Sequence, residues 1–200
     1  MTDLGPARRF LGIEIEKTKD GFCISQQTYI NTILRRFGLL DAKPAKTPLD
    51  PQVDLNNPHC KDKSVDRKEY LSIVGSLMYA ALGSRPDIAF SVTALSRYNV
   101  QPLEMHLTAA KRVLRYLKAT SSLRIHYRRL PHSKLSAVGY TDSDWAGNLK
   151  TRKSVGGCVF GLGYTNWNQE LVTSGLVHWQ AKSQSVVALF ASSHATRESL

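Results

Sequence analysis

Three segments near the end of the chain decide the fold: KLSAVGYTD (residues 134–142), KSVGGCVFGLG (153–163) and GLVHWQAKS (175–183). Each has β-type composition, and turn-rich stretches separate them, a pattern typical of strands joined by loops. Consecutive strands most often pair with their neighbours along the chain, so we expect a three-stranded antiparallel meander. The next segment, VVALFASSHATRESL (186–200), changes to helical spacing and predicts a C-terminal helix.

The N-terminal part predicts a β-hairpin followed by a helix. FLGIEI (10–15) has short β-type alternation, Asp20-Gly21 is a strong turn dipeptide, and FCIS (22–25) returns as the second strand. In QQTYINTILRRFG (26–38) the apolar residues recur at helical spacing. We expect Ser25 to cap the start of this helix and Gly38 to end it.

The middle of the chain predicts a connection and then a helical region. Residues 41–66 contain Pro44, Pro48, Pro51 and Pro58 among polar residues, which is typical of an extended linker. Residues 67–100 predict two helices that Arg85-Pro86-Asp87 separates, and Pro102 opens a third helix. The predicted fold class is therefore α+β: a β-hairpin and helix, a helical region, and a partial sheet with a C-terminal helix.

Composition and charge narrow the class of partner. The chain has 200 residues, of which 42% are apolar and 22% charged, and these values exclude a collagen-like or low-complexity chain. Lysine and arginine number 27 against 16 acidic residues, and residues 71–200 hold 15 of the basic residues but only 6 of the acidic ones. This surplus favours a polyanionic partner. A basic, solvated surface is the alternative interpretation.

Cysteine usage and hydropathy favour an intracellular, soluble protein without a membrane segment. The three cysteines are widely spaced and form no Cys-x-x-Cys pair, which argues against structural zinc and for a reducing compartment. The apolar stretches LMYAAL and VVALFA are too short to cross a bilayer, and no secretory signal is visible. We therefore expect a cytoplasmic or nuclear location, not secretion. The oligomeric state is not indicated.

Two groups of basic residues are candidates for nucleic-acid contacts. On the third helix Lys111, Arg112, Arg115 and Lys118 lie away from the apolar stripe, where they suit contacts with a phosphate backbone or form a solvated helix face. Arg152 and Lys153 follow an acidic segment and either neutralise substrate phosphate or belong to a solvated turn.

The segment GYTDSDWAG (139–147) is the candidate catalytic site. Asp142 and Asp144 are two residues apart at a strand end, and in an extended chain they share one face with Val138 and Tyr140. Carboxylates beside apolar side chains are costly unless they are paired. A divalent cation bound at Asp142 would remove that cost, and oxygen ligands favour Mg²⁺ or Mn²⁺. The alternative is that this Asp-x-Asp pair caps a loop.

Seven segments in this order resemble the copia-type LTR retrotransposon polyprotein, at the junction of its reverse transcriptase and ribonuclease H. They are DLGPARRFLGIEI, ISQQTYINTILRRFGL, AKTPLDP, YLSIVGSLMYAALGSRPDIAFSVTALSRY, HLTAAKRVLRYLKAT, GYTDSDWAGNLKTRKSVGGCVF and VHWQAKSQSVVAL. The resemblance implies that residues 1–40 are the end of the reverse transcriptase palm, 41–66 a proline-rich linker, 67–130 a helical thumb or connection, and 134–200 a truncated ribonuclease H-like domain. The implied partner is an RNA–DNA hybrid or another nucleic-acid duplex.

The catalytic residues that the resemblance implies are incomplete. The polymerase motif Tyr-x-Asp-Asp is absent. Ribonuclease H chemistry uses several carboxylates around two Mg²⁺ ions. Asp142 matches the first of these carboxylates, and Asp144 matches a family aspartate of less certain role. The next carboxylate belongs to a short stretch that is missing between Leu189 and Phe190, and Glu198 is a poor substitute for it.

We therefore expect a degenerate or truncated retrotransposon fragment that is catalytically inactive alone, with an ancestral Mg²⁺ site that is incomplete. One alternative is an active Mg²⁺-dependent ribonuclease H that other acids or another subunit complete. The other alternative is a non-catalytic module that binds nucleic-acid duplexes.

Overall fold

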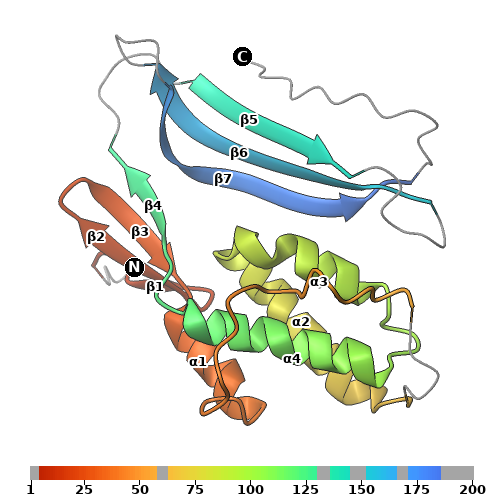
Figure 1. Cartoon of the computed structure of the whole chain (residues 1–200). Coiled ribbons are helices and arrows are strands. Elements are labelled where there is room, and N and C mark those ends of the chain that lie inside the picture. The colour runs from red at the N-terminus through yellow and green to blue at the C-terminus, as the bar shows by residue number, and fades with distance from the viewer. Residues whose placement is uncertain (1–4, 58–62, 130–135, 145–151, 166–170, 186–200) are drawn as a thin grey trace.

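A computed structural model of the chain describes residues 5–57, 63–129, 136–144, 152–165 and 171–185. These residues form four α-helices, a short 3₁₀ helix and two antiparallel sheets, with three strands before the helices and four after them (Figure 1). The predicted α+β class is confirmed at this level. None of the described helices is long and apolar enough to span a membrane.

The first sheet contains the predicted hairpin and a strand that the sequence did not indicate. Its strands are β1 (Arg9–Phe10), β2 (Ile13–Thr18), β3 (Gly21–Ser25) and β4 (Ile125–Arg128), in that spatial order. The turn is one residue earlier than predicted, because Thr18 pairs with Gly21 and leaves Lys19 and Asp20 as the loop. Strand β4 comes from the basic segment after the helices and pairs antiparallel with β3.

Gly21 is required by the close approach of β3 and β4. Its φ is +151°, and a Cβ at this position would overlap the carbonyl oxygen of Tyr127 on β4. Only glycine combines this backbone conformation with so short a separation between strands. The glycine of the predicted turn dipeptide is therefore needed because β3 and β4 pack closely, and it lies next to the turn.

Helix α1 (Gln27–Arg36) begins without the predicted Ser25 cap. Ser25 is instead the buried last residue of β3, and its hydroxyl donates to the Glu14 carboxylate over 2.8 Å. The other oxygen of Glu14 accepts the backbone N–H of Thr28 in the first turn, over 3.2 Å. The Glu14 carboxylate on the neighbouring strand β2 thus caps α1 in place of Ser25. Its negative charge is favourable at the positive end of the helix dipole.

The prediction that Gly38 ends α1 is confirmed. Gly38 has φ +67°, its N–H donates to the Arg35 carbonyl, and the Leu39 N–H donates to the Leu34 carbonyl. These two bonds form the Schellman arrangement that commonly ends helices.

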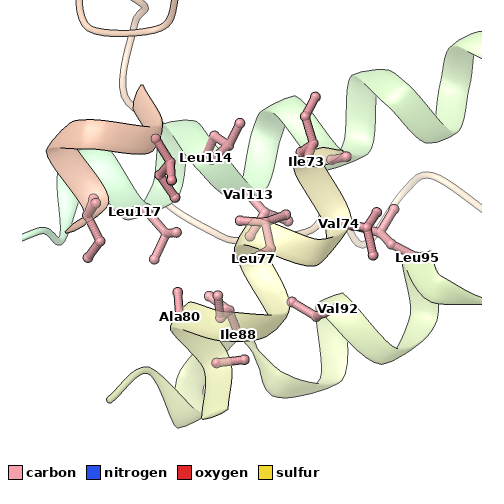
Figure 2. Packing of buried hydrophobic residues seen from close by; sticks show 14 of the residues in the cluster. Ile73, Val74, Leu77, Ala80, Ile88, Val92, Leu95, Val113, Leu114 and Leu117 are labelled. Carbon is pink, nitrogen blue, oxygen red and sulfur yellow. The ribbon is translucent and has the colours of Figure 1, made fainter. Parts of the chain in front are cut away.

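The helical region has the predicted breaks. Asp66 caps the start of helix α2 (Arg67–Gly83), and its side chain accepts the Lys68 N–H. The short helix η1 (Pro86–Ile88) and α3 (Ala89–Ser96) follow, and α4 (Glu104–Ala119) comes after Pro102. Figure 2 shows the buried apolar side chains that these helices share, among them Leu77, Leu95 and Leu114. This cluster, which also receives residues of α1, is the main hydrophobic core of the described chain.

The second sheet is the predicted three-stranded meander. Strands β5 (Ser136–Ser143), β6 (Val155–Thr165) and β7 (Leu171–Ser183) lie in the order β5-β6-β7, all antiparallel. The predicted helix over 186–200 lies outside the described residues. The domain boundaries that we predicted stay predictions.

Strand β7 attaches this sheet to the rest of the molecule (Figure 1). The Trp179 indole N–H donates to the Ala81 carbonyl on α2 over 2.7 Å, and the Thr93 hydroxyl on α3 donates to the Ala181 carbonyl over 2.8 Å. On β4 the Tyr127 hydroxyl donates to the Leu176 carbonyl over 2.8 Å. Helices and both sheets therefore meet along β7.

Candidate nucleic-acid interface and acidic strand end

Asp142 lies near the end of β5 and is exposed. Its Oδ1 accepts the backbone N–H of the next residue, Ser143, over 2.8 Å. The register places it opposite Gly157, on the face of the sheet that carries Val138 and Tyr140, as the alternation predicted. A pocket of about 710 Å³ lies here between β5–β7 and the start of α3. Its lining includes Phe90, Tyr140, Asp142 and Trp179.

Asp144 has a structural partner. Its Oδ1 accepts the backbone N–H of Val155 over 2.5 Å, and its own N–H donates to the Val155 carbonyl over 3.1 Å. These bonds extend the pairing of β5 and β6 by one residue beyond the strand end. This contact is what the loop-capping interpretation of the Asp-x-Asp pair predicts for Asp144.

The described residues do not fit a two-magnesium centre. No group of three or more His, Cys, Asp or Glu residues in the described part of the chain is close enough to hold a metal ion. Asp142 offers a carboxylate with only a local hydrogen bond, and one oxygen of Asp144 is taken by Val155. Glu198 and the position between Leu189 and Phe190 lie outside the described residues.

Arg152 and Lys153 lie at the same end of the hairpin as the two aspartates. They lie three and two residues before β6, whose residue Gly156 pairs with Ser143. Arg152 is exposed and has φ +55°, while Lys153 is half-buried. Their predicted role toward phosphate stays a prediction, and their location beside the acidic strand end is compatible with it.

Three of the four basic residues of α4, Arg112, Arg115 and Lys118, contact the proline-rich segment that follows α1. We call residues 41–57 the strap, which crosses α4 after leaving α1 (Figure 1). Lys118 Nζ donates to the Ala42 carbonyl over 2.8 Å, and Arg115 Nε donates to the Lys43 carbonyl over 2.6 Å. The predicted linker is therefore held to α4 at several points, although most of its described residues are exposed.

The four basic residues of α4 differ in how far their charge is compensated. Lys111 pairs with Glu69 over 2.9 Å, and Arg112 pairs with Asp50 over 3.3 Å. Arg115 and Lys118 instead bond to neutral carbonyl oxygens, so their positive charges have no acidic partner among the described residues. The surplus positive charge of α4 therefore lies toward its C-terminal end.

A buried histidine fixes the far end of the strap, which sequence analysis did not foresee. The ring of His106 on α4 stacks on Tyr98, with centroids 3.7 Å apart. Its Nδ1 accepts the Leu103 N–H over 3.0 Å, so Nε2 carries the proton that it donates to the Leu55 carbonyl over 3.1 Å. The Tyr98 hydroxyl donates to the side chain of Asn56. No spacing in the sequence signals the contacts with the strap, because Leu55 and Asn56 lie 51 and 42 residues before their partners.

A mixed α+β chain with an acidic strand end and a basic helix is compatible with many proteins that bind nucleic acids, and comparison with known proteins narrows the class. Residues 1–51 match the reverse transcriptase (RNA-dependent DNA polymerase) family. The retrovirus-related Pol polyprotein from transposon TNT 1-94 of Nicotiana tabacum is 37% identical over 196 residues, which cover 94% of this chain and 14% of the polyprotein. The transposon RE1 polyprotein of Arabidopsis thaliana is 40% identical over 155 residues, covering 78% of this chain and 10% of that protein.

A shorter relative matches over most of its own length. An uncharacterized mitochondrial protein of Arabidopsis thaliana is 39% identical over 191 residues, which cover 94% of this chain and 72% of that protein. No solved structure matches the chain. The chain belongs to the copia-type retrotransposon Pol polyprotein family, of whose long members it spans only a small part.

Proposed function

We propose that this chain is a retroelement fragment that binds RNA–DNA hybrid or another nucleic-acid duplex and does not cleave it by itself. In this proposal residues 1–40 derive from the end of the polymerase palm, 67–130 from the thumb or connection, and the sheet β5–β7 from the first half of a ribonuclease H-like domain. The family supports an ancestral role in retroelement replication.

The contact of Asp144 with Val155 carries the non-catalytic part of this proposal. Cleavage with two metals needs carboxylates that bridge and orient both ions beside the scissile phosphate. Asp142 alone would offer Mg²⁺ one carboxylate, and Asp144 has an oxygen committed to the hairpin. We infer that an ancestral Mg²⁺ site has lost the set of ligands that held a metal pair.

The uncompensated charges of α4 carry the binding part. Arg115 and Lys118 can keep their bonds to the strap carbonyls and still attract phosphate, because those bonds leave their charge in place. Lys111 and Arg112 would first have to leave Glu69 and Asp50. We therefore assign the larger share of duplex affinity to Arg115 and Lys118.

A cleavage assay tests the non-catalytic part. The full chain is incubated with a labelled RNA–DNA hybrid and Mg²⁺ beside the variant Asp142→Asn. We expect both proteins to leave the hybrid intact. Cleavage by the native chain that the variant loses would overturn the proposal.

A binding assay tests the other part. Affinity for the hybrid should fall steeply with salt, with a slope of about −0.9 for each phosphate contact. Arg115→Gln and Lys118→Gln should each lower the affinity and flatten that slope, and Lys111→Gln should change both less. Binding that does not respond to salt, or that Lys111→Gln weakens most, would contradict the assignment.

A second candidate function is an active ribonuclease H that another subunit completes. The observation in its favour is that Asp142 is exposed and lines the 710 Å³ pocket rather than being buried against its own chain. It predicts cleavage that depends on Asp142 and rises more than linearly with protein concentration.

A further inference from the structure

A pocket lies where β4, β7 and the junction between α2 and η1 meet. Its volume is about 440 Å³, which is within the range of ligand sites. The lining residues come from three parts of the chain: 84–87 at the helix junction, 123–128 on and before β4, and 174–176 on β7. All of them are described residues, and none belongs to the α4 surface or to the acidic strand end.

Basic residues recur along the β4 side of this pocket. Arg124, His126 and Arg128 occupy alternate positions, so they share one face of the strand, and all three line the pocket. His126 and Arg128 are exposed. β4 is the last strand of its own sheet, and β7 of the other sheet lies against it, with the Ser174 hydroxyl donating to the Arg128 carbonyl.

The charges at the pocket do not cancel. Arg85 and Asp87 form a close ion pair over 2.7 Å and neutralise each other. Arg124 pairs with Glu16, which lies outside the lining, so this pair is also compensated. The Arg128 guanidinium has no acidic partner in the described part of the chain.

We propose that this pocket binds a phosphate group, with Arg128 and His126 as its principal contacts and Arg124 as a supporting charge. A phosphate monoester carries nearly two negative charges at neutral pH, and the uncompensated charge of Arg128 attracts such a group. Guanidinium groups bind phosphate through paired N–H donors. The volume admits a group larger than an isolated phosphate ion, so a nucleotide or the end of a nucleic-acid strand is a suitable carrier.

Calorimetric titration of the full chain with inorganic pyrophosphate tests the proposal. Arg128→Gln should weaken binding about tenfold, as the loss of a charge-assisted hydrogen bond does. His126→Gln should weaken it less, and Arg128→Lys should restore part of the affinity. The matched control is Arg129→Gln, which removes the same charge one residue further on from a residue outside the lining. Circular dichroism verifies that each variant is folded.

The outcomes separate this site from general attraction to a basic protein. Equal losses in Arg128→Gln and Arg129→Gln, or no loss in Arg128→Gln, would overturn the proposal. Succinate, which carries two carboxylates, should bind more weakly than pyrophosphate, and equal affinity would contradict the assignment to phosphate.

A single-stranded oligonucleotide with and without a 5′-phosphate then identifies the source of the phosphate group. A gain in affinity that needs both the 5′-phosphate and Arg128 indicates a strand end. Pyrophosphate binding without that gain indicates a free phosphate compound. Since Arg115 and Lys118 are intact in every variant, failure here leaves the proposed duplex binding untouched.

Discussion

The Arg85 guanidinium is 1% exposed and forms two parallel bonds with the Asp87 carboxylate, Nε to Oδ1 over 2.9 Å and Nη2 to Oδ2 over 2.7 Å. The Thr120 carbonyl and hydroxyl accept from its terminal nitrogens, and the Tyr116 hydroxyl donates to Asp87. Burial and the hydrogen bond to the neighbouring carboxylate raise the pKa of Tyr116, so its hydroxyl keeps its proton at neutral pH. The pair joins the junction of α2 and η1 to the end of α4.

Asp87→Ala should strongly destabilise the chain, because it leaves a buried guanidinium without its counter-charge. We expect the free energy of unfolding to fall by about 3 kcal/mol, a value typical of a broken buried pair. Urea denaturation followed by circular dichroism measures it. Glu69→Ala, which removes the exposed partner of Lys111, should cost less than about 1 kcal/mol. Similar losses in both variants would show that burial of Arg85 is not the cause.

Two glycines with different surroundings offer a matched comparison. Gly21→Ala should cost about 3 kcal/mol, because the new Cβ meets the backbone of β4, which has no room to move. Gly38→Ala should cost about 1 kcal/mol, since Gly38 has a positive φ but nothing within 4 Å of the added atom. Denaturant titrations of both variants check this. If the two variants lose the same free energy of unfolding, close packing against β4 is not the reason that position 21 requires glycine.

Much of the fold follows from the sequence because it depends on local patterns. The hairpin, the breaks at Pro86, the end of α1 at Gly38 and the order β5-β6-β7 all depend on residues close together in the chain. Strand β4 escaped prediction because it has four residues and gains its pairing from β3, about a hundred residues earlier. The Ser25 cap was wrong for a related reason: Glu14 on a paired strand is a better acceptor, and its position depends on register.

The sequence predicted which residues belong to the candidate site, but not their ion-pair and hydrogen-bond partners. The sequence indicated which face of α4 is basic, yet it could not indicate that Asp50 and Glu69 compensate two of its charges. Likewise the spacing of Asp142 and Asp144 placed both at a strand end, and only the geometry shows Asp144 bonded to Val155. The partner of a side chain depends on the three-dimensional fold, and the spacing of residues along the chain does not determine it.

Glu14 makes part of the stability depend on pH. Partial burial raises the pKa of its carboxyl, but hydrogen bonds from Thr28 and Ser25 and the charge of Arg9 outweigh it, so the pKa lies below its ordinary value of 4.5. A lowered pKa in the folded state means that this contribution is complete above pH 4.5 and is lost as the pH falls through the folded-state value.

Glu14→Gln should therefore reduce the free energy of unfolding by about 1 kcal/mol at pH 7, and the difference from the native chain should shrink as the solution becomes acidic. Urea denaturation at a series of pH values measures it. Asp41→Asn removes an exposed carboxylate that has no side-chain hydrogen bond among the described residues, and it serves as the control. If the difference in free energy of unfolding between the native chain and Glu14→Gln grows below pH 4.5, the pKa of Glu14 is not lowered in the folded state.

Asp50→Asn should strengthen binding of an RNA–DNA hybrid, provided that α4 carries the duplex contact. Asp50 neutralises Arg112 across 3.3 Å in a half-buried surface pair, and surface pairs are worth about 0.2–1 kcal/mol. Its loss frees one more cation for phosphate, so we expect affinity to rise up to about fivefold and the salt slope to steepen by about 0.9. Fluorescence anisotropy at several salt concentrations measures both quantities. Asp54→Asn removes the same charge from the same strap, but the Asp54 side chain bonds only to Asn56 among the described residues. If both variants gain equally, net charge explains the effect and the release of Arg112 does not; if Asp50→Asn gains nothing, the strap does not limit the basic face of α4.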